Sequence, residues 1–274
     1  MSDVSLGEVD ERGLSYPCGE APAHGETREV APGIFWVRMP LPFSLDHINL
    51  WLLDDGDGWV LVDTGVGDER TKAAWQQIFD EHLGGKPITR VIVTHLHPDH
   101  VGLAGWITRK FGVTLEMSRT DYLMCRTLAA DTGNPPPEDA LKFYRAAGFS
   151  ERGVDAYAKR FGGFGERISR LPDVFKRLKE GDTLSIAGRT WRVIVGSGHA
   201  PEHVCLFCDD LKILISGDQV LPRISSNVSR TGLTAVARSR RRYRKIRLFC
   251  PRIMSRSMAC IVAWMRWLRV MKTG

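Results

Sequence analysis

VTHLHPDHVG, residues 93–102, places four side chains that can bind a metal within six positions: His95, His97, Asp99 and His100. His95 and His97 are two positions apart, so at the end of an extended strand both side chains face the same way. A proline then ends the strand, and Asp99 and His100 project from the turn that opens the next helix. Because imidazole nitrogens and carboxylate oxygens together suit Zn, Fe or Mn, this stretch predicts a metal site at a strand-to-helix junction.

Two later stretches have the same chemical character. GSGHAPEH, residues 196–203, places His199 in a glycine-flanked turn after a strand, where the backbone can approach a ligand closely. ISGD, residues 215–218, places Asp218 at the end of an apolar run, and a carboxylate there is suited to bridge two metals about 3.5–4 Å apart. Asp63, in LVDTG, also ends a strand and is placed to support a ligand histidine from behind. Each of these residues alone is an ordinary turn residue, but their order after the histidine-rich stretch favours one shared site.

The surrounding sequence alternates between strand-like and helix-like patterns. We expect strands at 33–40, 90–95 and 114–118, a hairpin at 47–65, helices at 69–83, 101–111 and 120–130, and further strands in the runs DTLSIAG, RTWRVIVGS, HVCLFCDD and LKILISGD. Many of these strands are joined to their neighbours by hairpin-length turns. The alternation predicts an α/β sandwich of mixed sheets covered by helices.

Residues 131–178 interrupt this alternation. The segment opens with the loop TGNPPPED, continues with helical periodicity, and carries a series of aromatic residues from Phe143 to Phe164. We interpret it as an inserted helical lid. The alternative is a packed connecting segment.

The composition is that of an ordinary globular protein, with 43% hydrophobic residues. No window contains the roughly 18 uncharged apolar residues that a membrane span needs. The N-terminal stretch MSDVSLGEVDERG is polar and acidic and lacks the basic start and apolar run of a signal peptide, so we expect a cytoplasmic protein. In a reducing compartment the six cysteines are expected to be free thiols.

The sequence resembles the metallo-β-lactamase-fold hydrolase superfamily, which includes glyoxalase II-like thioesterases and lactonases. The matching stretches are VDTG at 62–65, THLHPDH at 94–100, GHAPEH at 198–203 and SGDQVLPRISSNVS at 216–229. The resemblance implies an αββα four-layer sandwich of two mixed β-sheets flanked by helices. It also implies that residues 1–229 form one metallo-β-lactamase-like domain, followed by an irregular C-terminus.

The resemblance implies a site for two divalent metal ions, zinc first, with iron or manganese as alternatives. The residues that it implies as ligands are His95, His97 and His199 for the first ion, Asp99 and His100 for the second, and Asp218 as the bridge. Asp99 is also implied as the catalytic proton acceptor, and His203 as a residue that orients its loop. A metal-bound water would attack an ester, thioester or lactone carbonyl. The expected partner is therefore a small acyl substrate.

The C-terminal segment, residues 230–274, departs from this pattern. It carries 11 arginines and 2 lysines and no acidic residue, whereas residues 1–229 carry 25 basic and 32 acidic residues. The superfamily usually supplies one more histidine for the second metal from a loop near the C-terminus, but the last histidine of this chain is His203. The second metal site is therefore expected to be incomplete. We expect residues 230–274 to form a poorly ordered basic tail.

A frameshift explains this departure. Permitted codons for RLFCPRIMSRSMACIVAWMRWL, residues 247–268, read two bases later as AVLPSHNEPFHGLHRRVDALA, which is similar to the missing end of the family. We therefore interpret the chain as out of frame from about residue 230. The alternatives are a nucleic-acid-binding arm around RSRRRYRK (238–245) and a membrane-surface helix at 261–272. We expect neither a nucleic-acid nor a membrane partner, because basic blocks are commonly flexible tails.

Two other functions remain open at this point. A one-iron sulfur dioxygenase acting on a persulfide would need only His95, His97 and His199 with Asp218, and this set is intact. A chain that lacks the last metal ligand is also compatible with an inactive relic. A lactamase is less favoured, because such enzymes are usually exported.

Overall fold

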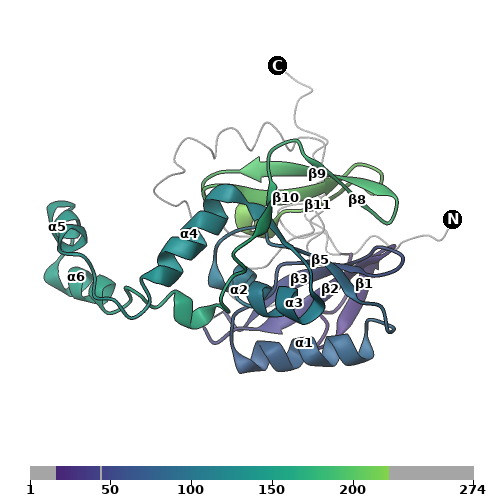
Figure 1. Ribbon diagram of the computed structural model, residues 1–274, viewed down its shortest axis with the longest axis horizontal. Coiled ribbons are helices and arrows are strands. Elements are labelled where there is room, and N and C mark those ends of the chain that lie inside the picture. The colour runs from purple at the N-terminus through teal and green to yellow at the C-terminus, as the bar shows by residue number, and fades with distance from the viewer. Residues whose placement is uncertain (1–16, 44, 222–274) are drawn as a thin grey trace, which may run out of the picture.

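Two β-sheets stack face to face at the centre of the computed structural model, which describes residues 17–43 and 45–221 (Figure 1). The first sheet has seven strands, in the order β1 to β7, and the second has four, in the order β11-β10-β9-β8. The strands of the first sheet are β1 (Thr27–Ala31), β2 (Ile34–Pro40), β3 (His47–Asp54), β4 (Trp59–Val62), β5 (Ile88–Ile92), β6 (Leu115–Ser118) and β7 (Phe175–Leu178). Those of the second sheet are β8 (Thr183–Ile186), β9 (Arg189–Gly196), β10 (His203–Cys208) and β11 (Ile213–Ile215).

The two sheets differ in strand direction. Strands β1 to β4 are antiparallel to their neighbours, and β4 to β7 are parallel, so the first sheet is mixed, as expected. The described strands of the second sheet are all antiparallel, which corrects the expectation of two mixed sheets. The reason is that short turns join successive strands there, and a short turn can connect only antiparallel neighbours.

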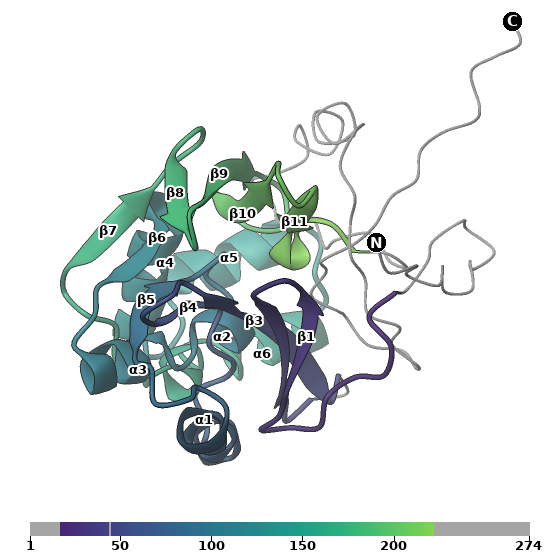
Figure 2. The same ribbon diagram turned by 90° about the vertical axis from the view of Figure 1, so that its right-hand side faces the viewer.

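Helices cover one face of the first sheet, and the second sheet covers the other (Figure 2). The helices are α1 (Glu69–Glu81), α2 (Pro98–Val101), α3 (Ala104–Phe111) and α4 (Arg119–Ala130). Trp75, Ile107 and Tyr122 bring α1, α3 and α4 into one apolar core with the first sheet. Within residues 17–43 and 45–221, three of the four layers of the expected αββα sandwich are therefore in place.

The single helix expected at 101–111 is divided between α2 and α3. Gly102 lies so close to a neighbouring loop that a Cβ atom there would be 2.4 Å from the carbonyl oxygen of Gly65. The carbonyl oxygen of Gly102 accepts hydrogen bonds from the backbone N–H and the hydroxyl of Ser169, at 2.6 and 2.9 Å. These contacts with distant segments replace the helical hydrogen bond, which periodicity alone does not reveal.

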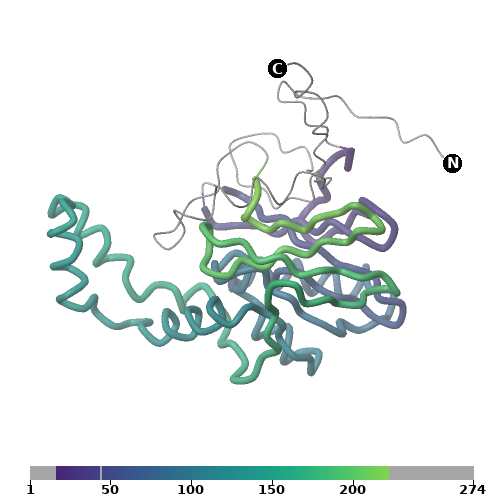
Figure 3. Tube along the Cα trace, turned by 90° about the horizontal axis from the view of Figure 1, so that it is seen from above, coloured from purple at the N-terminus to yellow at the C-terminus, as the bar shows by residue number. Residues whose placement is uncertain are grey.

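The expected lid is an arm that extends from the body. Helices α5 (Glu138–Ala146) and α6 (Glu151–Ala158) project away from both sheets in two perpendicular views (Figure 1, Figure 3). They pack on each other through Tyr144 and Tyr157, whose ring centroids are 4.3 Å apart. The helical pattern does not continue to residue 178 as expected, because residues 175–178 form β7 beside β6. A role for the arm in covering the site stays a prediction.

The basic segment 230–274 and the out-of-frame interpretation lie outside the described residues. In the part of the chain that the structure describes, no helix combines the length and the apolar character required to cross a membrane.

Replacing Trp36 by alanine is expected to lower the free energy of unfolding by about 3–5 kcal/mol. Trp36 is fully buried between the two sheets, and its indole N–H donates to Oδ1 of Asn49 at 2.7 Å. The substitution leaves a cavity and an unpaired buried amide oxygen. Urea unfolding followed by circular dichroism measures the change. Val174→Ala, at a position that is 75% exposed, is the control and should change stability by less than about 0.5 kcal/mol. Equal effects of the two substitutions would contradict the assigned packing.

Candidate metal centre

The candidate site lies where loops from the two sheets meet. The chain leaves β5 and reaches His95 and His97 in the loop that precedes α2, and Asp99 and His100 lie within α2. From the second sheet, His199 comes from the loop between β9 and β10. Asp218 lies in the short helix η2 (Gly217–Gln219), directly after β11. All six residues that the sequence predicts as ligands are thus brought to the same place.

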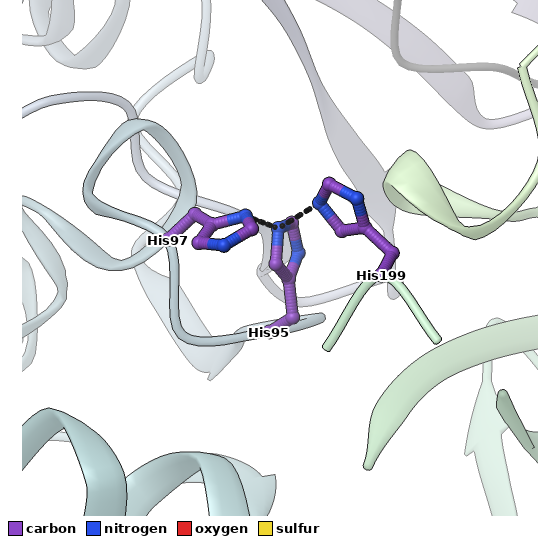
Figure 4. A group of neighbouring side chains, drawn as sticks. All are labelled: His95, His97 and His199. Carbon is purple, nitrogen blue, oxygen red and sulfur yellow. Dashed lines mark hydrogen bonds between the residues drawn. The ribbon is translucent and has the colours of Figure 1, made fainter. Parts of the chain in front are cut away.

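Three imidazole rings converge from the two sides of this site. Nε2 of His95 lies 2.9 Å from Nδ1 of His97 and 3.2 Å from Nε2 of His199 (Figure 4). Four ligands arranged tetrahedrally around zinc at 2.0–2.1 Å are about 3.3–3.4 Å apart. The two separations from His95 are therefore already close to the spacing of ligands that share one ion, and all three nitrogens lie within 4.8 Å of one another.

The protonation of these rings agrees with metal binding. Burial, together with the neighbouring histidines, lowers the pKa of His95 well below its usual value and that of His97 to about 4. Both rings are therefore neutral at pH 7, which is the form that coordinates a metal. The donor set thus fits a divalent cation such as zinc.

A second group of donors lies beside the first. Nε2 of His100 is 3.5 Å from Oδ1 of Asp218 and 3.8 Å from Oδ2 of Asp99. The other carboxylate oxygen of Asp218 is 3.5 Å from Nε2 of His199. Asp218 therefore lies between the two groups, where one carboxylate can serve both.

Electrostatic forces in the second group favour a cation. Burial opposes the charged form of His100, but the carboxylates of Asp63, Asp218 and Asp99 together raise its pKa well above its usual value. Burial raises the pKa of Asp99. Burial also opposes the ionisation of Asp218, but the positive charge of His100 outweighs it and holds the pKa of Asp218 below its usual range. Carboxylates gathered in a buried place are stable only with positive charge among them.

Asp63 lies behind two of the histidines, on the side away from the site. Its carboxylate accepts the Nδ1–H of His100 at 2.8 Å and the hydroxyl of Thr94 at 2.8 Å, and that hydroxyl lies 3.0 Å from Nδ1 of His95. These bonds engage the Nδ1 atoms of His95 and His100 and leave their Nε2 atoms facing the site. Asp63 has φ of 64°, a left-handed conformation that is uncommon for a residue other than glycine.

His203 is placed behind the site rather than in it. Burial lowers its pKa well below the usual value, so the ring is neutral, and its Nε2 accepts the backbone N–H of Asp218 at 3.1 Å. Gly217 permits this contact, because a Cβ at that position would lie 2.5 Å from the ring. His203 thus contacts the backbone of Asp218 directly, and its orienting role stays a prediction.

Sequence reasoning missed Asp121 and Glu202, which join the ligand loops to each other. The pattern S-x-x-D at 118–121 is visible in the sequence, but it is typical of an ordinary helix start. It therefore did not indicate a contact with the site.

A cavity of about 320 Å³ opens beside α4, at the base of the arm. It is lined by Cys125, Arg126, Ala129, Thr132, Gly165, Ile168, Arg170 and Leu171. None of the candidate metal donors lines it, so it is distinct from the site.

The family model of the metallo-beta-lactamase superfamily matches residues 44–263, which is most of the chain. The chain belongs to this superfamily. Within it, the chain is similar to a beta-lactamase domain protein from Burkholderia ambifaria of known structure. That protein is 39% identical, with a TM-score of 0.77 over 93% of this chain and 75% of that one.

The metallo-beta-lactamase family protein TTHA1429 from Thermus thermophilus has the same fold. It is 23% identical, with a TM-score of 0.62 over 86% of this chain and 76% of that one. The resemblance and the fold class inferred from the motifs are confirmed.

Two relatives of named activity are more distant. The chain is 26% identical over 200 residues to the probable metallo-hydrolase YqjP of Bacillus subtilis (strain 168), covering 70% of this chain and 58% of that protein. It is 27% identical over 201 residues to the acyl-coenzyme A thioesterase MBLAC2 of Gallus gallus, covering 70% of this chain and 65% of that protein. The chain therefore matches less than two thirds of the length of either relative.

Proposed function

We propose that this chain is a metal-dependent hydrolase of small thioesters or esters. The observation that carries the proposal is the convergence of three imidazole rings, two of them held neutral by burial, beside a buried carboxylate, Asp218, that faces a second group of donors. Similarity to a thioesterase and a metallo-hydrolase favours acyl substrates. The proposed ligands are His95, His97 and His199 for the first ion, and Asp99, His100 and Asp218 for the second.

A divalent ion held there would polarise the substrate carbonyl and lower the pKa of a bound water. The chain's own residues supply the proton acceptor. The side chain of Asp99 is 18% exposed, whereas that of Asp218 is 3% exposed and lies between the two donor groups. Asp99 is therefore the carboxylate that both solvent and substrate can reach, and we assign it the role of general base.

The second ion is expected to bind more weakly than the first. Its donors number three, and one of them, Asp218, is shared with the first group. No histidine follows His203 in the sequence to add another. Sequencing the gene across codons 220–274 tests whether an alternative reading frame supplies that ligand.

The purified protein, loaded with zinc, should hydrolyse acyl-coenzyme A or glutathione thioesters, measured as thiol release with a chromogenic disulfide. His97→Ala should lose this activity, and His82→Ala, at the C-terminal end of α1, should keep it. Iron-loaded protein assayed for oxygen uptake with glutathione persulfide tests the dioxygenase alternative. Oxygen uptake without thiol release would overturn the hydrolase proposal, and so would the absence of both reactions.

A further inference from the structure

Asp121 is a buried carboxylate that lies outside the group of candidate ligands. It occupies the first turn of α4 and has no solvent exposure. Oδ1 accepts the backbone N–H of Leu96 at 3.0 Å, and Oδ2 accepts the backbone N–H of Glu202 at 2.8 Å. The hydroxyl of Ser118 donates to Oδ2 at 3.2 Å. A buried carboxylate is costly unless donors surround it; the two shorter bonds, from backbone N–H groups, fix its position between the loops, and the longer hydroxyl bond only adds to its solvation.

The two backbone partners of Asp121 belong to the two loops that carry His95, His97 and His199 (the histidine triad). Leu96 stands between His95 and His97 in the chain, and Glu202 stands between His199 and His203. One carboxylate therefore connects the ligand loop of the first sheet with the ligand loop of the second. These are the same two loops that bring Nε2 of His199 within 3.2 Å of Nε2 of His95.

The side chain of Glu202 in turn hydrogen-bonds to the first turn of α4. Its carboxylate accepts the backbone N–H of Thr120 at 2.8 Å, while Asp121 accepts the N–H of Glu202. This is the reciprocal pattern of a capping box, but its two halves come from segments 81 residues apart. Ser118, the N-cap residue, makes no capping hydrogen bond of its own. The first turn of α4 is thus completed only when the loop containing His199 is docked against it.

We infer that Asp121 is a positioning residue for the metal site, which clamps the two ligand loops at the spacing that one ion requires. The inference rests on the proposed metal-binding function. It goes beyond that function by assigning the geometry of the triad to a residue that touches neither metal nor substrate. A carboxylate is needed because only two acceptor oxygens on one rigid group can receive both N–H groups at once.

Asp121→Asn tests this inference. A carboxamide can accept only one of the two backbone N–H groups, and its own NH₂ group then faces the other. The affinity for zinc, measured by competition with a chromophoric chelator, should fall about 10- to 100-fold, as it does when a partner behind a metal ligand is lost. The visible absorption bands of the cobalt-substituted protein should also shift, because the three imidazoles no longer share one geometry.

Two control substitutions separate positioning from general destabilisation. Glu116→Gln alters another buried carboxylate, on β6, whose partners are Arg90 and Lys176 rather than the ligand loops. Ser118→Ala removes only the hydroxyl that contacts Asp121. Both variants should keep the zinc affinity and the cobalt spectrum of the wild type, even where unfolding by urea shows a loss of stability.

The remaining outcomes are also decisive. If Asp121→Asn does not fold, Glu202→Ala, which removes the carboxylate that caps α4, should weaken zinc binding by a smaller factor in the same direction. Wild-type zinc affinity in whichever of these variants folds would overturn the inference alone. Wild-type protein that binds no zinc at all would overturn the proposed function and this inference with it.

Discussion

Removal of bound metal by a chelator is expected to reduce thioester hydrolysis by about a thousandfold or more, and added zinc is expected to restore it. Activation of water and polarisation of the carbonyl by a metal ion contribute several kcal/mol to catalysis, and each 1.36 kcal/mol corresponds to a factor of ten in rate. The rings of His95 and His97 are neutral at pH 7, so without a metal ion they supply no positive charge to polarise the carbonyl or to activate water.

The measurement compares hydrolysis rates before dialysis against a chelator, after it, and after titration with zinc. Magnesium is the matched control, because it prefers oxygen ligands and should not restore activity. Circular dichroism of the metal-depleted protein must show that the fold is kept. Metal analysis should give closer to one tightly held zinc ion per chain than two. Full activity of the metal-depleted protein would contradict the proposed function, whereas two tightly held ions would contradict only the incomplete second site.

Asp218→Asn is expected to lower hydrolysis by more than about a hundredfold. Loss of a partner that merely supports a metal ligand already costs 10- to 100-fold, and Asp218 itself lies 3.5 Å from both His100 and His199. The carboxamide is nearly the same shape but is neutral, so it removes the negative charge between the two donor groups without creating a cavity.

Asp210→Asn provides the comparison for this change. Asp210 is exposed in the turn between β10 and β11, eight positions before Asp218 in the chain, and its substitution should leave hydrolysis and zinc affinity unchanged. The rates should be measured at several zinc concentrations, so that weaker metal binding is separated from slower chemistry. Equal activity of the two variants would exclude a role for Asp218 between the ions.

Much of the fold could be predicted because its elements follow local patterns. The short apolar run of β5 and the alternation in β9 predict strands, and α4 was expected at 120–130 and begins at Arg119. For one of the wrong predictions, a distant segment decided the outcome. The helix expected at 101–111 is divided at Gly102 because Ser169, 67 positions away in the chain, binds its carbonyl oxygen.

The candidate ligands were recognisable in the sequence because metal coordination limits both residue type and spacing. His95 and His97 are alternate residues of one extended segment, and Asp99 and His100 open the next helix, so a short stretch of chain carries most of the chemistry. His199 and Asp218 each follow a strand of the second sheet, where a strand end exposes a side chain at the sheet edge.

Asp63 and His203 were expected to support the ligands, but their bonding partners and the contacts of Asp121 were not recognisable, because these contacts join segments far apart in the chain. The bonds of Asp121 to Leu96 and Glu202, and of His203 to the backbone of Asp218, depend on how the two sheets stack. The direction in which the arm formed by α5 and α6 leaves the body was also not recognisable in the sequence. Local sequence thus determines which residues are the candidate ligands. The tertiary structure determines where they lie relative to one another, because a hydrogen bond of about 3 Å forms only after the fold has brought its partners together.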